Sequence, residues 1–375
     1  MKKMKIKTIL VSMMATVAGM TTLASCGDDD DEPKVVNGNG EEVVLNSNYM
    51  KYQAAVDAEV KKAKKNDKVI LLVAFGSTWN NAFLAFDATK KAYETEFPDC
   101  DVYVSYSSAI CINRAAAGEN TDEQGNIVKR NYYAPNFWLH AFATAKYKDI
   151  TVQSLQVIPG EEYSRVINYI KDFANNYLGD LDDEYLKGLD GHLWLGTPLL
   201  NNTDDVAHVA DLIHQQYSQK AQEGVVAFMG HGNPDTYDTY KANIRYTQLE
   251  EALQLKSTNY FVGTVDMDGN YKQDVLQRMQ QAGITGGKIN LYPLMSICGD
   301  HGHNDMAGEG DEYWDPEEEE SEDNSWFEYF SHKGYQPVSN LFGLLEVEAI
   351  RNVWIEHTKD PVELEDYYHS MYPEE

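Results

Sequence analysis

Gly224-Val-Val-Ala-Phe-Met-Gly-His231-Gly232 is an apolar run that ends in a histidine between two glycines. A second stretch repeats this arrangement, with Ile289-Asn-Leu-Tyr-Pro-Leu-Met-Ser-Ile297 followed by Cys298-Gly-Asp300-His301. Each apolar run predicts a buried strand, and each histidine follows the carboxyl end of its strand. Open parallel sheets bind their ligands at that edge. We therefore expect His231 and His301 to meet in one cleft, where two imidazoles can hold a metal ion.

The rest of the chain alternates apolar runs with amphipathic segments from Asn48 onward, as α/β proteins with parallel sheets do. The predicted strands cover 69–75, 101–106, 150–157, 193–197, 224–229, 260–265, 288–295 and 335–339. The predicted helices cover 80–96, 137–147, 161–177, 204–220, 270–283 and 343–358.

An internal repeat divides this alternation into two halves. The strand and glycine turn at 69–76 match those at 225–230 in pattern, and 150–158 matches 289–297. We therefore predict an α/β fold of two similar doubly wound parallel-sheet lobes that face each other across a cleft, with one large doubly wound unit as the alternative. The N-terminal lobe covers 48–200, and the C-terminal lobe, 201–375, carries the metal site.

The first residues predict an export signal. Four lysines among the first seven residues precede a short apolar segment from Ile9 to Leu23, which is too short and interrupted to span a membrane. Leu23-Ala-Ser-Cys26 resembles a bacterial lipobox, in which Cys26 becomes the lipidated first residue of the mature chain. An ordinary cleavage site beside an unrelated cysteine is the alternative.

The acidic run from Asp28 to Glu32 resembles the export tag of bacterial surface lipoproteins, and it also suits a solvated linker. We expect a signal peptide over 1–25 and an acidic tether over 26–47. The expected location is the outer membrane, at the cell surface or alternatively on the periplasmic face. The lipid on Cys26 is the only expected membrane contact.

The chain is strongly acidic, with 31 Lys and Arg against 60 Asp and Glu and a net charge of −29. Such a surface repels nucleic acid and attracts cations, so no nucleic-acid partner is expected. An acidic insertion over 309–328 follows the second histidine motif. We expect a solvated loop near the cleft, with a cation-collecting lip as the alternative. Cys298 beside that motif is expected to be a core or pocket thiol, not a nucleophile.

The third ligand of the metal site is expected at Asp266, which follows the predicted strand over 260–265. Two histidines and one carboxylate leave coordination positions open on cobalt, nickel, zinc or iron(II). Asp300, His303 and Asp305 compete for this role. Chain neighbours of a ligand, however, often orient it without binding the metal themselves.

Nine short fragments occur in an order and spacing that match one family. They are Phe75-Gly-Ser-Thr78, Val152-Gln-Ser-Leu155, Gly160-Glu-Glu-Tyr163, Gly196-Thr-Pro-Leu-Leu200, Met229-Gly-His-Gly232, Pro293-Leu-Met295, Gly299-Asp-His301, Asn304-Asp-Met306 and Ala349-Ile-Arg351. From about Lys68 to Glu356 the chain resembles the anaerobic sirohydrochlorin cobaltochelatases of cobalamin biosynthesis. The resemblance implies a ferrochelatase-like fold and a lyase that inserts metal into a tetrapyrrole.

The resemblance also implies roles for particular residues. The family holds its metal with two histidines and a glutamate, which correspond here to His231, His301 and Asp266, the last one methylene shorter. His231 and His301 are the expected catalytic residues, and His231 accepts the pyrrole protons. The expected macrocycle contacts are Phe75, Gly76, Ser77, Gln156 and Gly232. Gln156 stands where the family usually has histidine. Trp79 and Tyr163 are further candidates for stacking on the macrocycle.

The predicted function is insertion of a divalent metal, Co²⁺ first and Fe²⁺ or Ni²⁺ as alternatives, into sirohydrochlorin or a related macrocycle. The metal is a substrate, and no organic cofactor is expected, with haem as the alternative. Because export separates the chain from cytoplasmic precursors, the alternative function is surface capture of haem or a corrinoid, or removal of its metal. The sequence does not decide whether the protein forms a homo-oligomer.

Overall fold

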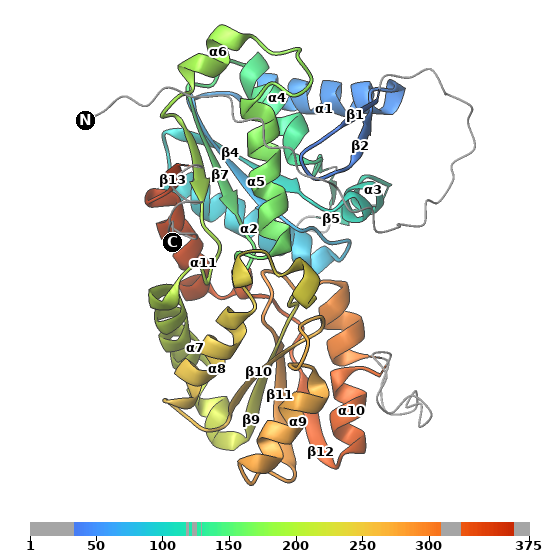
Figure 1. Ribbon diagram of the computed structural model, residues 1–375, viewed down its shortest axis with the longest axis vertical. Coiled ribbons are helices and arrows are strands. Elements are labelled where there is room, and N and C mark those ends of the chain that lie inside the picture. The colour runs from blue at the N-terminus through green and yellow to red at the C-terminus, as the bar shows by residue number, and fades with distance from the viewer. Residues whose placement is uncertain (1–33, 118–119, 122–125, 129, 309–323, 364–375) are drawn as a thin grey trace.

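The computed structural model describes residues 34–117, 120–121, 126–128, 130–308 and 324–363. Two α/β lobes stack along the long axis of the molecule, as Figure 1 shows. This architecture confirms the predicted fold class. The predicted signal peptide over 1–25 and the first part of the tether, 26–33, lie outside the described residues.

The first lobe is built on a five-stranded sheet with the order β13-β8-β7-β3-β4. Its parallel strands are β3 (Lys68–Ala74), β4 (Cys100–Tyr106), β7 (Asp149–Ser154) and β8 (Leu193–Gly196). The short strand β13 (Val362–Glu363) pairs antiparallel with β8 at the edge.

The second lobe is built on a four-stranded parallel sheet with the order β10-β9-β11-β12. Its strands are β9 (Val225–Gly230), β10 (Tyr260–Thr264), β11 (Gly287–Pro293) and β12 (Tyr335–Ser339). Apart from β13, both sheets place their first strand between the second and the third and their fourth strand outside the third. β3 therefore corresponds to β9 and β7 to β11, as the sequence repeat predicts.

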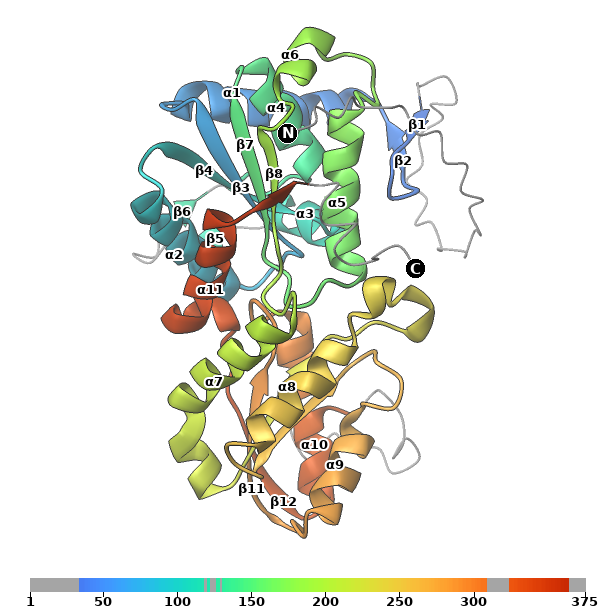
Figure 2. The same cartoon turned by 60° about the vertical axis from the view of Figure 1, so that its left-hand side comes forward.

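Helices pack on both sheets. In the first lobe α1 (Ser47–Ala63), α4 (Pro135–Thr144) and α5 (Glu161–Ala174) form one group, and α2 (Asn80–Glu96) packs with α11 (Glu348–Lys359). In the second lobe α7 (Thr203–Glu223) lies beside α8 (Ile244–Gln254), as Figure 2 shows, and α9 (Lys272–Gln281) packs with α10 (Trp326–His332). The shorter elements are β1 (Lys34–Val36), β2 (Glu42–Val44), α3 (Ala109–Ala117), β5 (Asn120–Thr121), β6 (Ile127–Val128) and α6 (Asp183–Gly188).

Strand β9 shows why the second sheet has a core on each face. Val225, Ala227 and Met229 belong to the core that includes residues of α9 and α10. Val226 and Phe228 point to the opposite face and join the larger core that includes α7 and α8. Alternate side chains of a strand face opposite sides of its sheet, so a strand buried on both faces is apolar throughout.

The chain returns to the first lobe at its C-terminal end. Helix α11 packs against β7 and β8, and β13 extends the first sheet. The predicted C-terminal lobe, 201–375, therefore differs from the structure, in which the described segment from 348 to 363 belongs to the first lobe. The second sheet is inserted between β8 and α11.

The predicted acidic insertion, 309–328, is described only from residue 324. Asn324 and Ser325 are buried, and the Ser325 Oγ accepts a hydrogen bond from the Glu328 N–H at the start of α10. These last residues are thus part of the packed second lobe and not of a solvated loop, while 309–323 lie outside the described residues. Within the described ranges no helix is long and apolar enough to cross a membrane.

Candidate functional site

A cleft that is open to solvent lies between the two lobes. The first lobe lines it with Phe75, Gly76, Ser77 and Gln156, and the second with His231, Gly232 and His301. The structure therefore brings together the predicted catalytic histidines and the predicted macrocycle contacts. Of the other stacking candidates, Tyr163 is fully buried in the core and Trp79 contacts the other lobe instead.

His231 directly follows β9, and its ring is oriented by the backbone. The Nδ1 atom lies 2.7 Å from the carbonyl oxygen of Gly232, so Nδ1 carries the proton and donates it. The Nε2 atom of the neutral ring is then an unprotonated acceptor, 3.6 Å from Asp266 Oδ2. Such a fixed tautomer is what a metal ligand or a general base needs.

His301 is held in the same way from its Nδ1 side. It precedes a π-helical turn, Gly302–Ala307, which places Asp305 at the Nδ1 edge of the ring. Asp305 Oδ2 lies 2.5 Å from His301 Nδ1 and leaves Nε2 available. The ring centroids of His301 and His231 are 4.8 Å apart and the rings are nearly perpendicular, at 84°.

The two imidazoles differ in proton affinity. Burial lowers the pKa of His231, and the neighbouring charge of His301 lowers it further. The hydrogen bond to Asp305 raises the pKa of His301, and the negative charges of Asp305 and Asp266 add to this effect. A pair of titratable groups whose environments separate their pKa values is typical of a site that moves protons. At neutral pH the His231 ring is neutral, because its pKa lies below the ordinary 6.5.

Asp266 lies beside this pair, as predicted, at the end of β10. Its backbone N–H donates to the carbonyl of His231, 2.8 Å away, which joins the two strand-end loops. However, within the described parts of the chain, no group of three or more His, Cys, Asp or Glu side chains is arranged to hold a metal ion. The ligand set of His231, His301 and Asp266 therefore stays a prediction.

The competing ligand candidates have other partners. Asp305 orients His301, and Asp300 accepts a hydrogen bond of 2.6 Å from Trp79 Nε1. His303 stacks on the Trp79 indole with ring centroids 3.6 Å apart. The side chains of these three residues are thus engaged with His301 or with Trp79.

Two glycines keep the cleft wall free of side chains. Gly232 has φ +80°, and a Cβ atom there would lie 2.8 Å from the backbone nitrogen of Met267. Gly76 has φ +123°, and a Cβ atom would lie 2.7 Å from both Tyr106 and Cys111. Both positions combine positive φ with close packing, so no other residue fits without a shift of the wall.

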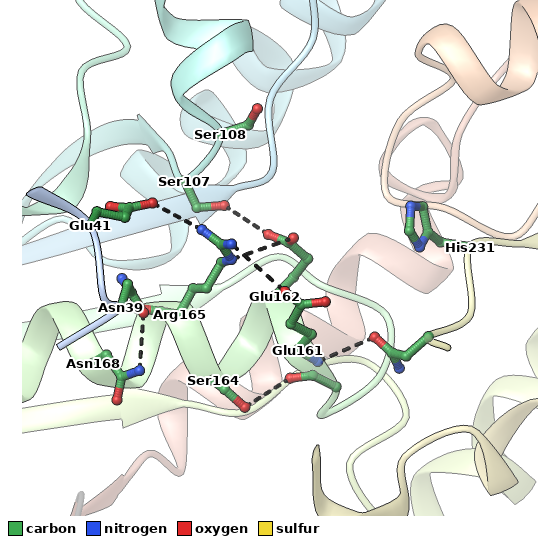
Figure 3. Close-up of polar contacts among 12 residues, drawn as sticks. Asn39, Glu41, Ser107, Ser108, Glu161, Glu162, Ser164, Arg165, Asn168 and His231 are labelled. Atoms are coloured by element: carbon green, nitrogen blue, oxygen red, sulfur yellow. Dashed lines mark hydrogen bonds and ion pairs between the residues drawn. The ribbon is translucent and has the colours of Figure 1, made fainter. Parts of the chain in front are cut away.

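Glu162 is a site residue that the sequence analysis missed. It lies in the first turn of α5 and lines the cleft, as Figure 3 shows together with His231 across from it. Burial raises its pKa to about 7, although the positive charge of Arg165 and a hydrogen bond from Ser107 oppose this effect. A carboxyl group with such a pKa exchanges protons at neutral pH. Its position in Gly160-Glu-Glu-Tyr163, after a strand end, was the available signal.

Gln156 presents an amide where an imidazole was expected. Its Oε1 accepts a hydrogen bond from Ser154 Oγ, while its buried Nε2 has no hydrogen-bond partner in the described part of the structure. Cys298 is fully buried, and burial raises the pKa of its thiol to about 12. Cys298 therefore stays protonated, which agrees with the prediction of a core or pocket thiol.

The chain was compared with family models, with curated proteins and with solved structures. The family described as cobalt chelatase (CbiK) matches residues 68–363. The sirohydrochlorin cobaltochelatase of Salmonella typhimurium is 26% identical over 293 residues, covering 77% of this chain and 94% of its own. The sirohydrochlorin cobaltochelatase CbiKC of Nitratidesulfovibrio vulgaris is 29% identical over 294 residues, covering 77% and 89%. The solved structure of SirB from Bacillus subtilis with Fe³⁺ covers 78% of this chain and 94% of its own, with a TM-score of 0.48 and 13% identity.

Proposed function

The chain belongs to the cobalt chelatase (CbiK) family, and on this premise we propose that it inserts a divalent metal into sirohydrochlorin or a related tetrapyrrole. Co²⁺ is the metal expected first, with Fe²⁺ and Ni²⁺ as alternatives. The observation that carries the proposal is the His231–His301 pair, whose rings meet in the cleft while each Nδ1 is engaged elsewhere.

The lining of the cleft suits a macrocyclic ligand. Residues of both lobes line it, and ligand sites often lie at the interface between domains. Phe75 is 41% exposed although it is aromatic, so a ring face is available for stacking. Gln156 also lines the cleft, although its Nε2 atom is itself buried.

Metal insertion releases two pyrrole protons, and the cleft has two groups suited to accept them. His231 is neutral and presents Nε2, so it accepts the first proton. Glu162, whose pKa is about 7, accepts the second as a carboxylate and passes it to solvent at the open mouth. Each group gains the proton that a pyrrole nitrogen loses, and that nitrogen keeps the electron pair for the metal.

The metal approaches from the side of His301 and Asp266 in this scheme. Both residues belong to the second lobe. The imidazole of His301 and the carboxylate of Asp266 are both groups that bind divalent cations. His301 has to lose its proton before its nitrogen can bind the metal, because the proton and the metal compete for one electron pair.

A second candidate function is capture of haem or a corrinoid, or removal of its metal, in the same cleft. It is favoured by the absence of a ready three-ligand group within the described residues and by the short Asp266. The Asp266 carboxylate is pulled back by about 1.5 Å, one C–C bond, relative to the glutamate that the family resemblance implies.

The experiment mixes the full chain with sirohydrochlorin and Co²⁺ and follows the absorbance spectrum against a control without enzyme. The His231→Ala variant should lose the acceleration, while His192→Ala, an exposed histidine paired with Asp149, should keep it. No acceleration by the wild-type chain would contradict the chelatase proposal. A spectral shift of added haem or corrinoid would then favour capture.

We also propose that the chain is an exported lipoprotein anchored through Cys26. The basic start, the short apolar segment and the lipobox-like Leu23-Ala-Ser-Cys26 support this location. The predicted tether over 26–47 is too long, because β1, β2 and the first residue of α1 lie within 34–47 and belong to the fold. The tether proposed here is therefore limited to residues 26–33.

A further inference from the structure

A β-hairpin precedes the part of the chain that the family matches. Strands β1 and β2 pair antiparallel, whereas the family match begins at residue 68. The connecting turn is ordered by Asn37, whose Oδ1 accepts hydrogen bonds from the N–H groups of Asn39 and Glu41 at 3.0 and 2.9 Å. Such turns fix the direction of the side chains that they carry.

The tip of this hairpin is docked on α5. The Gly38 N–H donates to Asp172 at 2.7 Å, and Asn168 donates to the Asn39 side chain at 3.0 Å. The Asn39 amide also donates to the carbonyl of Arg165 at 3.3 Å. Figure 3 shows Asn39 and Asn168 facing each other along the helix. The contacts are specific and come from consecutive turns of α5.

Glu41 is held by the hairpin and in turn holds Arg165. Its Oε2 accepts hydrogen bonds from Asn37 at 3.0 Å and from Tyr169 at 3.5 Å. Its Oε1 accepts a hydrogen bond from Arg165 Nη1 at 3.0 Å. Because both oxygens of Glu41 are engaged, its position defines where the guanidinium lies.

Arg165 also faces the two carboxylates at the start of α5, but at longer distances. Its Nη2 atom is 3.7 Å from Glu161 Oε1, and its Nε atom is 3.9 Å from Glu162 Oε1. The shortest contact of the guanidinium is thus with the hairpin and not with the residue that lines the cleft. Figure 3 shows Arg165 between Glu41 on one side and Glu162 on the other.

We propose that Glu41 is a positioning residue for the cleft: it holds the Arg165 guanidinium away from Glu162 and so keeps that carboxylate free to accept a proton. The use of that proton in metal insertion rests on the proposed function, whereas the positioning itself does not. The hairpin adds to the family fold a device that acts on a group in the cleft.

The charges around Glu162 give this inference a directional test. Arg165 and Glu161 face it from α5, Ser107 from the end of β4, Glu41 from the hairpin, and His231 across the cleft. Replacing Glu41 by Gln removes a negative charge and lets the guanidinium close on Glu162, so the pKa of Glu162 falls. Replacing Arg165 by Met removes the positive charge, so this pKa rises.

The experiment titrates the full chain carrying ¹³C-labelled glutamate carboxyl groups by NMR, with the Glu162 signal assigned from its loss in Glu162→Gln. We expect a fall of about half a pH unit or more in Glu41→Gln and a rise of similar size in Arg165→Met. Glu41→Asp keeps the negative charge, so the pKa of Glu162 should fall less in this variant than in Glu41→Gln. Glu184→Gln removes the same charge from an exposed pair with Lys187 and should leave the signal unchanged.

A merely structural role for the hairpin predicts something different, namely that both variants lower the melting temperature and move the Glu162 titration in one direction or not at all. That result would overturn the inference. If Arg165→Met does not fold, the fall in Glu41→Gln and its partial return in Glu41→Asp decide alone. Cobalt insertion is measured in parallel. If the Glu162 pKa shifts in opposite directions in the two variants but no protein inserts cobalt, only the proposed function is refuted. If cobalt is inserted but the Glu162 pKa does not shift, only the positioning role of Glu41 is refuted.

Discussion

The indole of Trp79 lies flat on the imidazole of His303, with ring centroids 3.6 Å apart and the planes within 5° of parallel. Trp79 precedes α2 in the first lobe, whereas His303 lies in the π-helical turn of the second. The indole N–H also donates to Asp300, a residue that lines the cleft. This pair therefore joins the two lobes at the edge of the cleft.

Replacing Trp79 by Ala should weaken tetrapyrrole binding, because the lobes lose their stacked contact. An aromatic pair contributes about 0.5–1.5 kcal/mol, so the KM for the macrocycle should rise about 2–10-fold. Trp79→Phe keeps a ring but loses the hydrogen bond to Asp300, and an intermediate KM is expected. Steady-state kinetics at saturating metal measure this, and an unchanged KM in Trp79→Ala would rule out the bridging role.

Replacing Asp266 by Glu should speed metal insertion. The longer side chain extends its carboxylate by about 1.5 Å, toward the space between His231 and His301. We expect at least a 3-fold rise in the rate with Co²⁺, about 0.7 kcal/mol in the barrier. Initial rates with Co²⁺, Ni²⁺ and Fe²⁺ would also show any change in metal preference. If the wild-type chain and Asp266→Glu insert each of the three metals at the same rate, Asp266 is not a ligand.

The insertion rate should fall as the pH drops below about 7. Glu162, with a pKa of about 7, accepts protons only as a carboxylate. The raised pKa of His301 favours its protonated form in acid, and that form has no free nitrogen for the proposed binding of metal. Both effects have the same sign. A kcat profile from pH 5 to 9 should therefore rise through about 7, and Glu162→Gln should flatten the part due to the carboxyl group. A profile that rises toward acid would contradict the assignment.

Ionised Glu162 should also lower the free energy of unfolding at alkaline pH. Its folded pKa of about 7 lies above the ordinary 4.5, so its contribution is complete below pH 4.5 and is lost as the pH rises through 7. Glu162→Gln should thus raise the free energy of unfolding at pH 8 by about 1–2 kcal/mol, a value reduced because the side chain is 30% exposed. Urea unfolding at pH 8 and pH 4.5 measures the difference, which should nearly vanish at the lower pH.

Replacing Cys26 by Ser should prevent attachment to the membrane. A thioether-linked lipid requires the Cys26 sulfur, so the variant should move from the membrane fraction to a soluble one and lose incorporation of labelled fatty acid. Cys111→Ser provides a control because this cysteine lies within the fold at α3. Labelling that persists in Cys26→Ser would place the lipid elsewhere or exclude it.

The sequence predicted the sheets better than the helices, for a physical reason. Strands such as β3 and β9 are buried on both faces and read as continuous apolar runs, so all eight predicted strands are present. Helices α1 and α8 were missed. For α1 the reason is that it buries only Gln53, Val56 and Val60 among many polar residues. So sparse an apolar stripe gives a weak helical signal.

The candidate site was predictable where it depends on strand ends and not where it depends on packing. His231 and His301 follow two neighbouring strands, β9 and β11, at one edge of the second sheet, as the two strand-end motifs predict. The role of Glu162 depends on burial and on Arg165 and Ser107, which only the folded chain assembles. The stacking of Trp79 on His303 likewise depends on how the lobes meet.

Because the second sheet is inserted between β8 and α11, two chain segments, 197–202 and 340–347, cross from one lobe to the other. A single connection allows one body to swivel freely, whereas two restrict it mainly to rotation about the line that joins them. The cleft is therefore suited to open about one axis. The proposed ligands His231, His301 and Asp266 all belong to the inserted lobe. This rotation therefore moves them together relative to Glu162 and Gln156 of the first lobe, and the distances among the three ligands do not change.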